Sequence, residues 1–138
     1  MPSYADFNQQ VIDEFRANAG AVGGGFQGAP IVLLHHKGAK TGKERVTPVV
    51  YLPDGGRFVI FGSKAGADTN PDWYHNLLAN PHTTIEVGPD TVEVTARVSE
   101  GEERERLWTK QKAAMPNFAE YERKTSRPIP VIVLEREG

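Results

Sequence analysis

The sequence predicts an α+β protein built on a six-stranded antiparallel β-barrel with helices at its periphery. Six short β-prone runs occur along the 138 residues, and most of them are joined in pairs by turns that contain glycine or proline. Strands and helices do not alternate in the regular way that a parallel sheet requires. Closing such a sheet into a barrel also removes exposed strand edges, which favour aggregation in an open sheet.

The chain opens with a predicted amphipathic helix that follows a capping residue, Ser3, and ends at Gly20. Its apolar side chains recur at helical spacing: Tyr4, Phe7, Val11 and Phe15. The segment 20–30 is too rich in glycine to hold a helix or a strand. We therefore expect a flexible connection between the helix and the barrel.

Three β-prone runs and a short helix follow this connection. The predicted strands are 31–36, 45–52 and 57–62. A Pro-Asp-Gly-Gly turn joins the second strand to the third. Asn70 before Pro71 predicts the N-cap and first residue of a helix over 71–80.

The last part of the sequence predicts a hairpin, two helices and a final strand. Runs 83–87 and 91–98 alternate polar with apolar residues around a Gly-Pro-Asp turn, and 129–135 is apolar enough to be buried on both faces. Ser99 and Glu102 form a capping-box pattern before a charged helix. Asn117 is a further cap, ahead of a short helix.

Composition excludes several classes of function. The chain contains no cysteine, so disulfide scaffolds, thiolate nucleophiles and iron–sulfur clusters are excluded. It has no apolar run near the roughly 20 residues of a membrane-spanning helix, and its start does not resemble a secretory signal. We expect a cytoplasmic protein. The net charge is −2, yet residues 35–64 hold six Lys or Arg against two acids, which favours a local anion site over general nucleic-acid binding.

The positive charge concentrates in the turn KGAKTGKER, residues 37–45. A turn whose glycines let backbone N–H groups converge among lysines can form a concave anion site, and Lys64 could close it. A solvated basic hairpin is the alternative, and charge alone favours it. Aromatic residues of the 71–80 helix, Trp73 and Tyr74, are equally open to core packing or to stacking on a ligand ring.

Other motifs carry no predicted site. The glycines at 20–25 follow a helix rather than a strand, which excludes a dinucleotide fingerprint, and Gly42-Lys43 lacks the spacing of a P-loop. His35 and His36 are adjacent on a predicted strand, so their side chains point to opposite faces. We therefore predict no metal site.

Four segments together resemble a known family. KGAKTGKERVTPVVYL, FVIFGSKAGADTNPDWYHNLLANP, ARVSEGEERERLW and RPIPVIVLE are similar, in order and spacing, to the deazaflavin (F420)-dependent nitroreductases and F420H2-dependent quinone reductases of actinobacteria. The resemblance runs from about residue 30 to 135. It implies a split β-barrel like that of FMN-binding proteins. The expected organisation is one domain over 1–138, with 1–29 as helix and connection and 30–138 as the cofactor-binding barrel.

The resemblance implies coenzyme F420 as the cofactor, and its phosphodiester and oligoglutamate tail would suit the basic turn. By similarity, phosphate and tail contacts come from Lys40, Thr41, Arg45 and Lys64. The deazaflavin is expected along Val46, Thr47, Pro48, Gly62 and Ser63, with Trp73, Tyr74 and Asn76 completing the wall. Lysine neutralises a flexible tail as a point charge, whereas arginine can grip a phosphate with paired hydrogen bonds.

The implied reaction is hydride transfer from reduced F420 to a quinone, an enone or a nitro compound. The expected substrate-pocket residues are Tyr51, Met115, Phe118 and Tyr121. The family's nitroreductase has tyrosines where this chain has Met115 and Phe118, which have no hydroxyl to donate. Nitroimidazole reduction is therefore not expected, and Tyr121, Ser63 or an ordered water is the predicted proton source.

Alternatives to this function are an FMN-binding split-barrel oxidoreductase, a non-catalytic F420 carrier and an RNA-binding barrel. FMN has one phosphate and would leave several lysines unused, and the net acidity disfavours RNA. The expected partner is a small-molecule hydride acceptor, with a homodimer as the expected assembly. The N-terminal helix is expected to pack over the barrel, and a weak peripheral membrane contact is its alternative role.

Overall fold

The computed structural model describes residues 4–18, 30–62 and 70–137, and the side chains from residue 9 onward within them. Its elements, in chain order, are α1 (Tyr4–Ala17), β1 (Ile31–Lys37), β2 (Glu44–Asp54), β3 (Arg57–Phe61), α2 (Asp72–Ala79), β4 (His82–Val87), β5 (Asp90–Val98), α3 (Gly101–Ala114), α4 (Asn117–Lys124) and β6 (Val131–Arg136). The strands close into a barrel in the order β1-β2-β3-β6-β5-β4, with every neighbouring pair antiparallel. The predicted fold class is confirmed.

Tight turns set the register of the hairpins. Asp54 pairs with Arg57 across the β2–β3 turn, where Gly55 and Gly56 have φ of 57° and 86°. Residues with a Cβ rarely adopt these backbone angles, so the Pro-Asp-Gly-Gly sequence suits this turn. Its chain reversal brings β3 against β2, as predicted.

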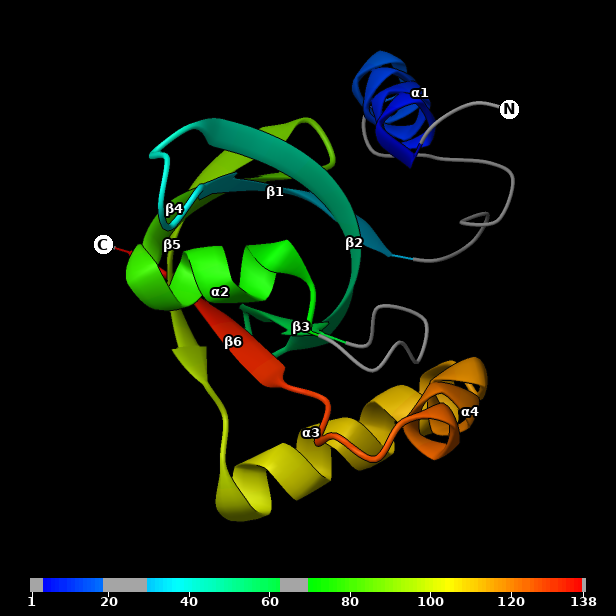
Figure 1. The fold of residues 1–138 in the computed structure, drawn as a ribbon. Helices are drawn as coiled ribbons and strands as arrows, with labels where there is room; N and C mark the ends of the chain where they lie inside the picture. Colours follow the sequence, from blue (N-terminus) through cyan, green and yellow to red (C-terminus); the bar gives the residue numbers. More distant parts are fainter. Residues whose placement is uncertain (1–3, 19–29, 63–69, 138) are drawn as a thin grey trace.

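The barrel interior forms the main hydrophobic core. Alternate residues of the strands point inward, and α2 lies across one end of the barrel (Figure 1). The helix contributes Trp73 and Leu77, which are 7% and 2% exposed, to this core. The strand residues of the cluster are Val32, Leu34, Phe58, Ile60, Ile85, Val94, Ile132 and Leu134. Core packing is therefore the structural role of Trp73.

Two smaller clusters cover the outside of the barrel. Ile12 and Phe15 of α1 pack with Ile31 and Leu33 of β1. Helices α3 and α4 lie beside β3 and β6 (Figure 1) and bury a second cluster, which includes Trp108 and is otherwise made up of Leu52, Val59, Phe61, Leu107, Phe118, Ile129, Val131 and Val133. Because both faces of β6 are covered, its residues 131–134 are all buried, as predicted.

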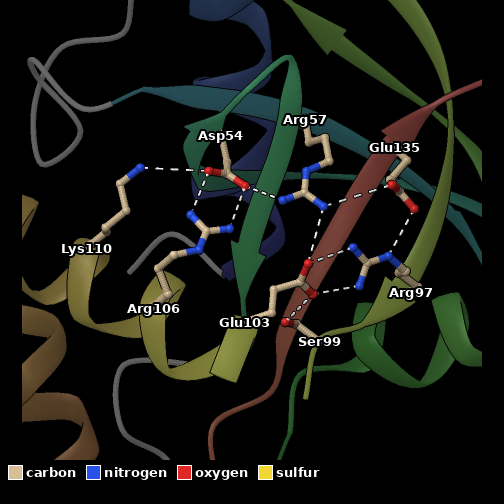
Figure 2. A network of polar contacts seen from close by, with 8 residues as sticks. All are labelled: Asp54, Arg57, Arg97, Ser99, Glu103, Arg106, Lys110 and Glu135. Carbon is tan, nitrogen blue, oxygen red and sulfur yellow. Dashed lines mark hydrogen bonds and ion pairs between the residues drawn. The ribbon is translucent and has the colours of Figure 1, made fainter. Parts of the chain in front are cut away.

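A network of ion pairs fastens α3 to the barrel strands (Figure 2). Glu103 of α3 accepts hydrogen bonds from both terminal nitrogens of Arg97 on β5, at 2.7 and 2.9 Å. Asp54 accepts two hydrogen bonds from Arg106 of α3, at 3.0 and 3.2 Å. Arg57 contacts both carboxylates and thereby joins the two halves of this network.

Three predicted helix caps are wrong. Pro71, not Asn70, occupies the N-cap of α2, and the Asn70 side chain instead accepts a hydrogen bond from Arg127 at 2.7 Å. The N-cap of α3 is Glu100, and Ser99 donates its hydroxyl hydrogen to the Glu103 carboxylate at 2.7 Å. The N-cap of α4 is Pro116, with Asn117 as the first helical residue. The Asn70 side chain is thus recruited by a partner far along the chain, whereas Ser99 bonds locally to a carboxylate four residues later.

Some predicted features lie outside the described residues. These are the capping Ser3, the glycine-rich segment 20–29, Ser63 and Lys64, together with the side chains of Tyr4 and Phe7. Among the helices that the structure describes, none combines the length and apolar character needed to cross a membrane.

Candidate functional site

The basic turn, defined here as residues 37–45, connects β1 to β2. The Gly42 N–H donates to the Gly38 carbonyl at 2.8 Å, and Gly42 has a φ of 68°. A Cβ added to Gly38 would lie 2.5 Å from the Thr41 hydroxyl oxygen. Glycine at position 42 therefore suits the conformation of the turn, and a side chain at position 38 would force the Thr41 hydroxyl to move.

Most backbone amides of the basic turn are already bonded within the protein. The Gly38 N–H donates to the Lys43 carbonyl at 2.9 Å, and the Lys43 N–H donates to the Thr41 hydroxyl at 3.2 Å. The Ala39 N–H donates to the side chain of Asn76 on α2 at 2.9 Å. The expected convergence of backbone N–H groups on an anion is thus wrong for these amides. Those of Lys40 and Thr41 have no bonded acceptor among the described residues.

The cations of the basic turn are exposed and have no acidic partner among the residues that the structure describes. In the part of the chain that the structure describes, no ion pair or side-chain hydrogen bond involves Lys37, Lys40, Lys43 or Arg45. Glu44, the single acid of the turn, directs its carboxylate to the His35 ring at 3.0 Å. The site therefore presents positive charge that no described residue neutralises by direct contact.

A chain of hydrogen bonds links this turn to the end of the barrel. Asn76 of α2, which is 7% exposed, receives the Ala39 N–H on its Oδ1. Its Nδ2 lies 2.9 Å from Nδ1 of His36, whose Nε2 lies 2.9 Å from the Thr47 hydroxyl on β2. Four segments, namely the turn, α2, β1 and β2, thus meet through buried or partly buried polar atoms.

Burial shifts the protonation of His36. His36 is 4% exposed, and its pKa is lowered from 6.5 to about 4, mainly by desolvation. Arg45 lies directly opposite His36 in the β1–β2 register, and its positive charge is the second cause of this lowering. Asp72 has the opposite effect, and it does not offset the other two. His36 is therefore neutral at physiological pH.

The predicted wall residues divide between the two faces of the sheet. Thr47 lies on the inner face with His36, whereas Val46 packs against the α1 cluster outside the barrel. Trp73 is buried and Tyr74 is half-buried against the barrel core. Pro48 is buried opposite Leu33.

Gly62 lies in a tight backbone position at the end of β3. Its N–H donates to the Pro130 carbonyl at 2.9 Å, and an added Cβ would come within 3.2 Å of the Pro130 ring. Its carbonyl accepts a hydrogen bond from Arg127 at 3.1 Å, and the same guanidinium nitrogen donates to Asn70 at 2.7 Å. Arg127 thereby connects the two residues that flank 63–69.

The four residues expected to line the substrate pocket lie in two different hydrophobic clusters. Tyr51 meets the Phe58 ring edge-on at a centroid distance of 5.5 Å and packs against the inner core. Phe118 is 6% exposed within the outer cluster, and Met115 and Tyr121 pack against that cluster. The Tyr121 hydroxyl accepts a hydrogen bond from Asn117 at 3.0 Å, which leaves its own hydrogen available to another acceptor.

Sequence reasoning missed the parts played by His36 and Arg127. Adjacent histidines on a predicted strand correctly indicated opposite faces, because His35 contacts Glu44 and Glu86 while His36 is buried. The alternation showed that one of the two would be internal, but no local signal named Asn76 as its partner. Arg127 follows a Thr-Ser pair in a segment without periodicity, so no sequence signal indicated its contacts.

A closed six-stranded antiparallel barrel of this order, with external helices and a cation-rich turn beside the helix across its end, defines a protein of the split-barrel fold class. The family follows from sequence comparison. The chain belongs to the F420H(2)-dependent quinone reductase family, whose sequence profile matches residues 8–136.

Individual relatives agree with this assignment. The F420H(2)-dependent quinone reductase Rv1261c of Mycobacterium tuberculosis (strain ATCC 25618 / H37Rv) is 42% identical over 126 residues, which cover 88% of this chain and 85% of that protein. A solved F420-H2 dependent reductase, FDR-A, has 42% identity and a TM-score of 0.71 over 77% of this chain and 94% of its own. A solved structure described as a domain-swapped dimer has 36% identity and a TM-score of 0.73 over 96% and 100% of the two chains.

Proposed function

We propose that this protein is an oxidoreductase that transfers a hydride from reduced coenzyme F420 to a quinone. The observation that carries the proposal is the set of exposed cations of the basic turn, which make no ion pair in the described structure. A cofactor with a phosphodiester and several carboxylates would complement them. Family membership and the F420 named for the relatives support the same cofactor.

The residues present fit an anionic cofactor at the basic turn. Arg45 can bind a phosphate through two parallel hydrogen bonds, and Lys40 can neutralise a mobile carboxylate as a point charge. The N–H groups of Lys40 and Thr41, which have no bonded acceptor among the described residues, add neutral donors. Other amides of the turn are occupied, so we assign most of the recognition to side chains. Lys64 belongs to the proposed set by sequence alone.

When bound, F420 supplies the hydride, and the protein supplies binding, orientation and a proton. We propose that Val46, Thr47, Pro48 and the Gly62–Ser63 backbone line the ring, with Trp73, Tyr74 and Asn76 behind it. The Thr47 hydroxyl is the best-defined donor of this set, because His36 fixes its oxygen. Trp73 and Asn76 act from the buried side by holding α2 against the barrel and the turn.

Reduction of a quinone develops negative charge on the acceptor oxygen, which a nearby proton donor stabilises. We propose Tyr121 for this role, with Ser63 as the second candidate. The Tyr121 hydroxyl has a fixed oxygen and an available hydrogen, whereas the neighbouring Phe118 has no hydroxyl. Met115, Phe118 and Tyr51 would then supply apolar surface rather than protons. Reduction of nitroimidazoles is not proposed.

The proposal treats residues 1–138 as one domain that works as a homodimer on a small-molecule acceptor. The solved relative described as a domain-swapped dimer supports the assembly. A membrane role for α1 has less support, because Val11, Ile12 and Phe15 are buried and Arg16 is paired with Glu86 at 2.7 Å. Packing over the barrel accounts for the described part of this helix.

The test is a fluorescence titration of the purified protein with oxidised F420, with FMN and NADP titrated in parallel, followed by turnover of reduced F420 with a naphthoquinone. We expect binding of F420 alone and quinone-dependent oxidation of reduced F420. Preference for FMN would favour an FMN-dependent split-barrel enzyme. Tight F420 binding without turnover by any quinone, enone or nitro acceptor would instead indicate a carrier.

A further inference from the structure

We propose that His36 is a positioning residue for the cofactor site, which acts as a neutral ring that orients the Thr47 hydroxyl and, through Asn76, holds the basic turn against α2. The inference deepens the proposed function and rests on it, because it concerns the residues that would meet F420. His36 contributes no atom to the exposed turn itself. Its ring is buried at the end of the barrel, with partners on α2 and β2.

The direction of each hydrogen bond follows from one group that can only donate. The backbone N–H of Ala39 must give its hydrogen to Oδ1 of Asn76, at 2.9 Å. The other end of that amide, Nδ2, is then a donor, and it lies 2.9 Å from Nδ1 of His36. A neutral ring that accepts on Nδ1 carries its hydrogen on Nε2, so Nε2 donates to the Thr47 oxygen at 2.9 Å.

The charges around His36 favour this neutral form. Burial is the main cause of the lowered pKa of His36, and Arg45, which faces it from β2, and His35, which precedes it on β1, lower the pKa as well. Asp72 on α2 acts in the opposite direction. A charged ring would place a second donor, Nδ1–H, against the Asn76 amide hydrogens. That conflict would require the amide to turn over and release the Ala39 N–H.

Two consequences for the site follow from the neutral ring. Because the Thr47 oxygen already accepts from His36, the hydroxyl hydrogen points away and is available to a ligand acceptor. Because the same series of hydrogen bonds ends at the Ala39 N–H, the backbone of the basic turn at Ala39 is fixed relative to α2. Ordering one donor and the cation-bearing loop before binding lowers the entropy lost when the cofactor binds.

The experiment combines binding titrations with a double-mutant cycle. His36→Phe keeps an aromatic ring but removes both nitrogens, Thr47→Val removes the hydroxyl, and His36→Gln keeps one donor and one acceptor. His82→Phe is the matched control, since His82 is an exposed histidine at the start of β4. F420 affinity is measured by fluorescence, and thermal unfolding by circular dichroism verifies that each variant is folded.

We expect His36→Phe and Thr47→Val each to raise the Kd for F420 about tenfold, which is the scale of one lost hydrogen bond. The effect of the double variant should be clearly smaller than the two single effects combined, because both substitutions remove the oriented Thr47 hydroxyl while only His36→Phe also removes the bond to Asn76. His36→Gln should recover most of the affinity, and His82→Phe should match the native protein. Native affinity in a folded His36→Phe variant, or additive effects in the double variant, would overturn the inference.

A second measurement needs no substitution and covers the case in which His36→Phe does not fold. Long-range ¹H–¹⁵N spectra of the cofactor-free native protein report which ring nitrogen carries the hydrogen. We expect His36 to be neutral and protonated on Nε2 at pH 7, and we expect its Nε2 resonance to shift when F420 is added. A charged ring, the other tautomer, or no shift would contradict the proposal. Failure of the proposed function is distinguishable, because the native protein itself would then not bind F420.

Discussion

Two regions contain the same kinds of charged residue but differ in what surrounds each cation. One is the basic turn, and the other is the α3 network, the ion pairs of Asp54, Arg57, Arg97, Glu103 and Arg106 between α3 and the barrel strands. In the network, Arg57, Arg97 and Arg106 all contact carboxylates of Asp54 or Glu103, and these contacts join β2, β3 and β5 to α3 (Figure 2). In the basic turn, Lys40 and Arg45 form no ion pair with any described residue.

This difference separates charges that support the fold from charges available to a ligand. Paired cations hold the pKa of Asp54 well below its usual range, and mainly Arg97 holds the pKa of Glu103 at about 2. Their charge is already balanced inside the protein. The turn instead concentrates like charges, which repel one another and make no direct contact with an acid of the described structure. We therefore expect substitutions in the turn to affect binding and those in the network to affect stability.

The largest expected effect comes from removing the two principal cations of the turn. The double variant Lys40→Ala/Arg45→Ala should raise the Kd for F420 about a hundredfold or more, because charge-assisted hydrogen bonds contribute about 1.5–3 kcal/mol each. Its unfolding temperature should stay within about two degrees of the native value. Fluorescence titration and thermal unfolding measure the two quantities. A large loss of stability with native affinity would show that the cations of the turn support the fold rather than bind the cofactor.

The matched control is Arg106→Ala, which removes a cation of the network. Arg106 bonds both oxygens of Asp54 and has no contact with the basic turn in the described structure. F420 affinity should be unchanged. If this variant lowered affinity as strongly as the turn variant, the effect would be one of overall charge rather than of a local site.

The second prediction concerns stability below neutral pH. The pKa of His36 is about 4 in the folded protein against 6.5 ordinarily, so the unfolded chain binds more protons between these values. The stabilisation from neutral His36 is fully present above pH 6.5 and is lost as the pH falls toward 4, by up to about 3 kcal/mol. Denaturant unfolding at a series of pH values should show this slope.

His36→Gln should flatten the dependence between pH 6.5 and 4, because glutamine does not titrate. A slope that persists there would show that other groups control it. Glu103, whose pKa is about 2, provides a separate and more acidic step, since its stabilisation is lost only as the pH falls from its ordinary range toward 2.

The third prediction is that weakening the α3 network lowers the stability of the protein moderately. Glu103→Gln keeps the size of the side chain but removes the charge that holds Arg97, Arg57 and Ser99. We expect the free energy of unfolding to fall by about 1–2 kcal/mol, discounted for partial exposure to solvent. F420 affinity should not change. Urea unfolding measures the first quantity, and an unchanged free energy would show that the network adds nothing to stability.

The smallest effect is expected at the edge of the network. The Lys110 ammonium lies 3.8 Å from Asp54 and is half exposed. Lys110→Ala should change the free energy of unfolding by less than about 0.5 kcal/mol, which is typical of an exposed ion pair. A change above 1 kcal/mol in urea unfolding would mean that the whole network acts cooperatively.

Much of the fold could be predicted from local sequence. Short β-prone runs, which alternate polar with apolar residues in 83–87 and 91–98, located all six strands, and glycine in the β2–β3 turn has the positive φ that the hairpin requires. The boundaries shifted by one or two residues; β1, for example, ends at Lys37 rather than His36. Helix caps were the main error, because the amide of Asn70 bonds to the distant Arg127 and the hydroxyl of Ser99 bonds to the Glu103 carboxylate four residues later.

The candidate site was predictable only in part. The cations of the turn and their position between two strands followed from the sequence. The occupation of the Gly38, Ala39, Gly42 and Lys43 amides did not, since it depends on the closed geometry of the turn and on α2.

By itself, then, the sequence determined the strands, the hairpin turns, the concentration of positive charge and the opposite orientation of His35 and His36. These depend on backbone conformation and side-chain periodicity, which act over a few residues. Only the tertiary structure decided which cations are neutralised and which histidine is held neutral beside Asn76. Asn76 lies 40 residues from His36 along the chain, and only closure of the barrel with α2 across its end brings the two side chains together.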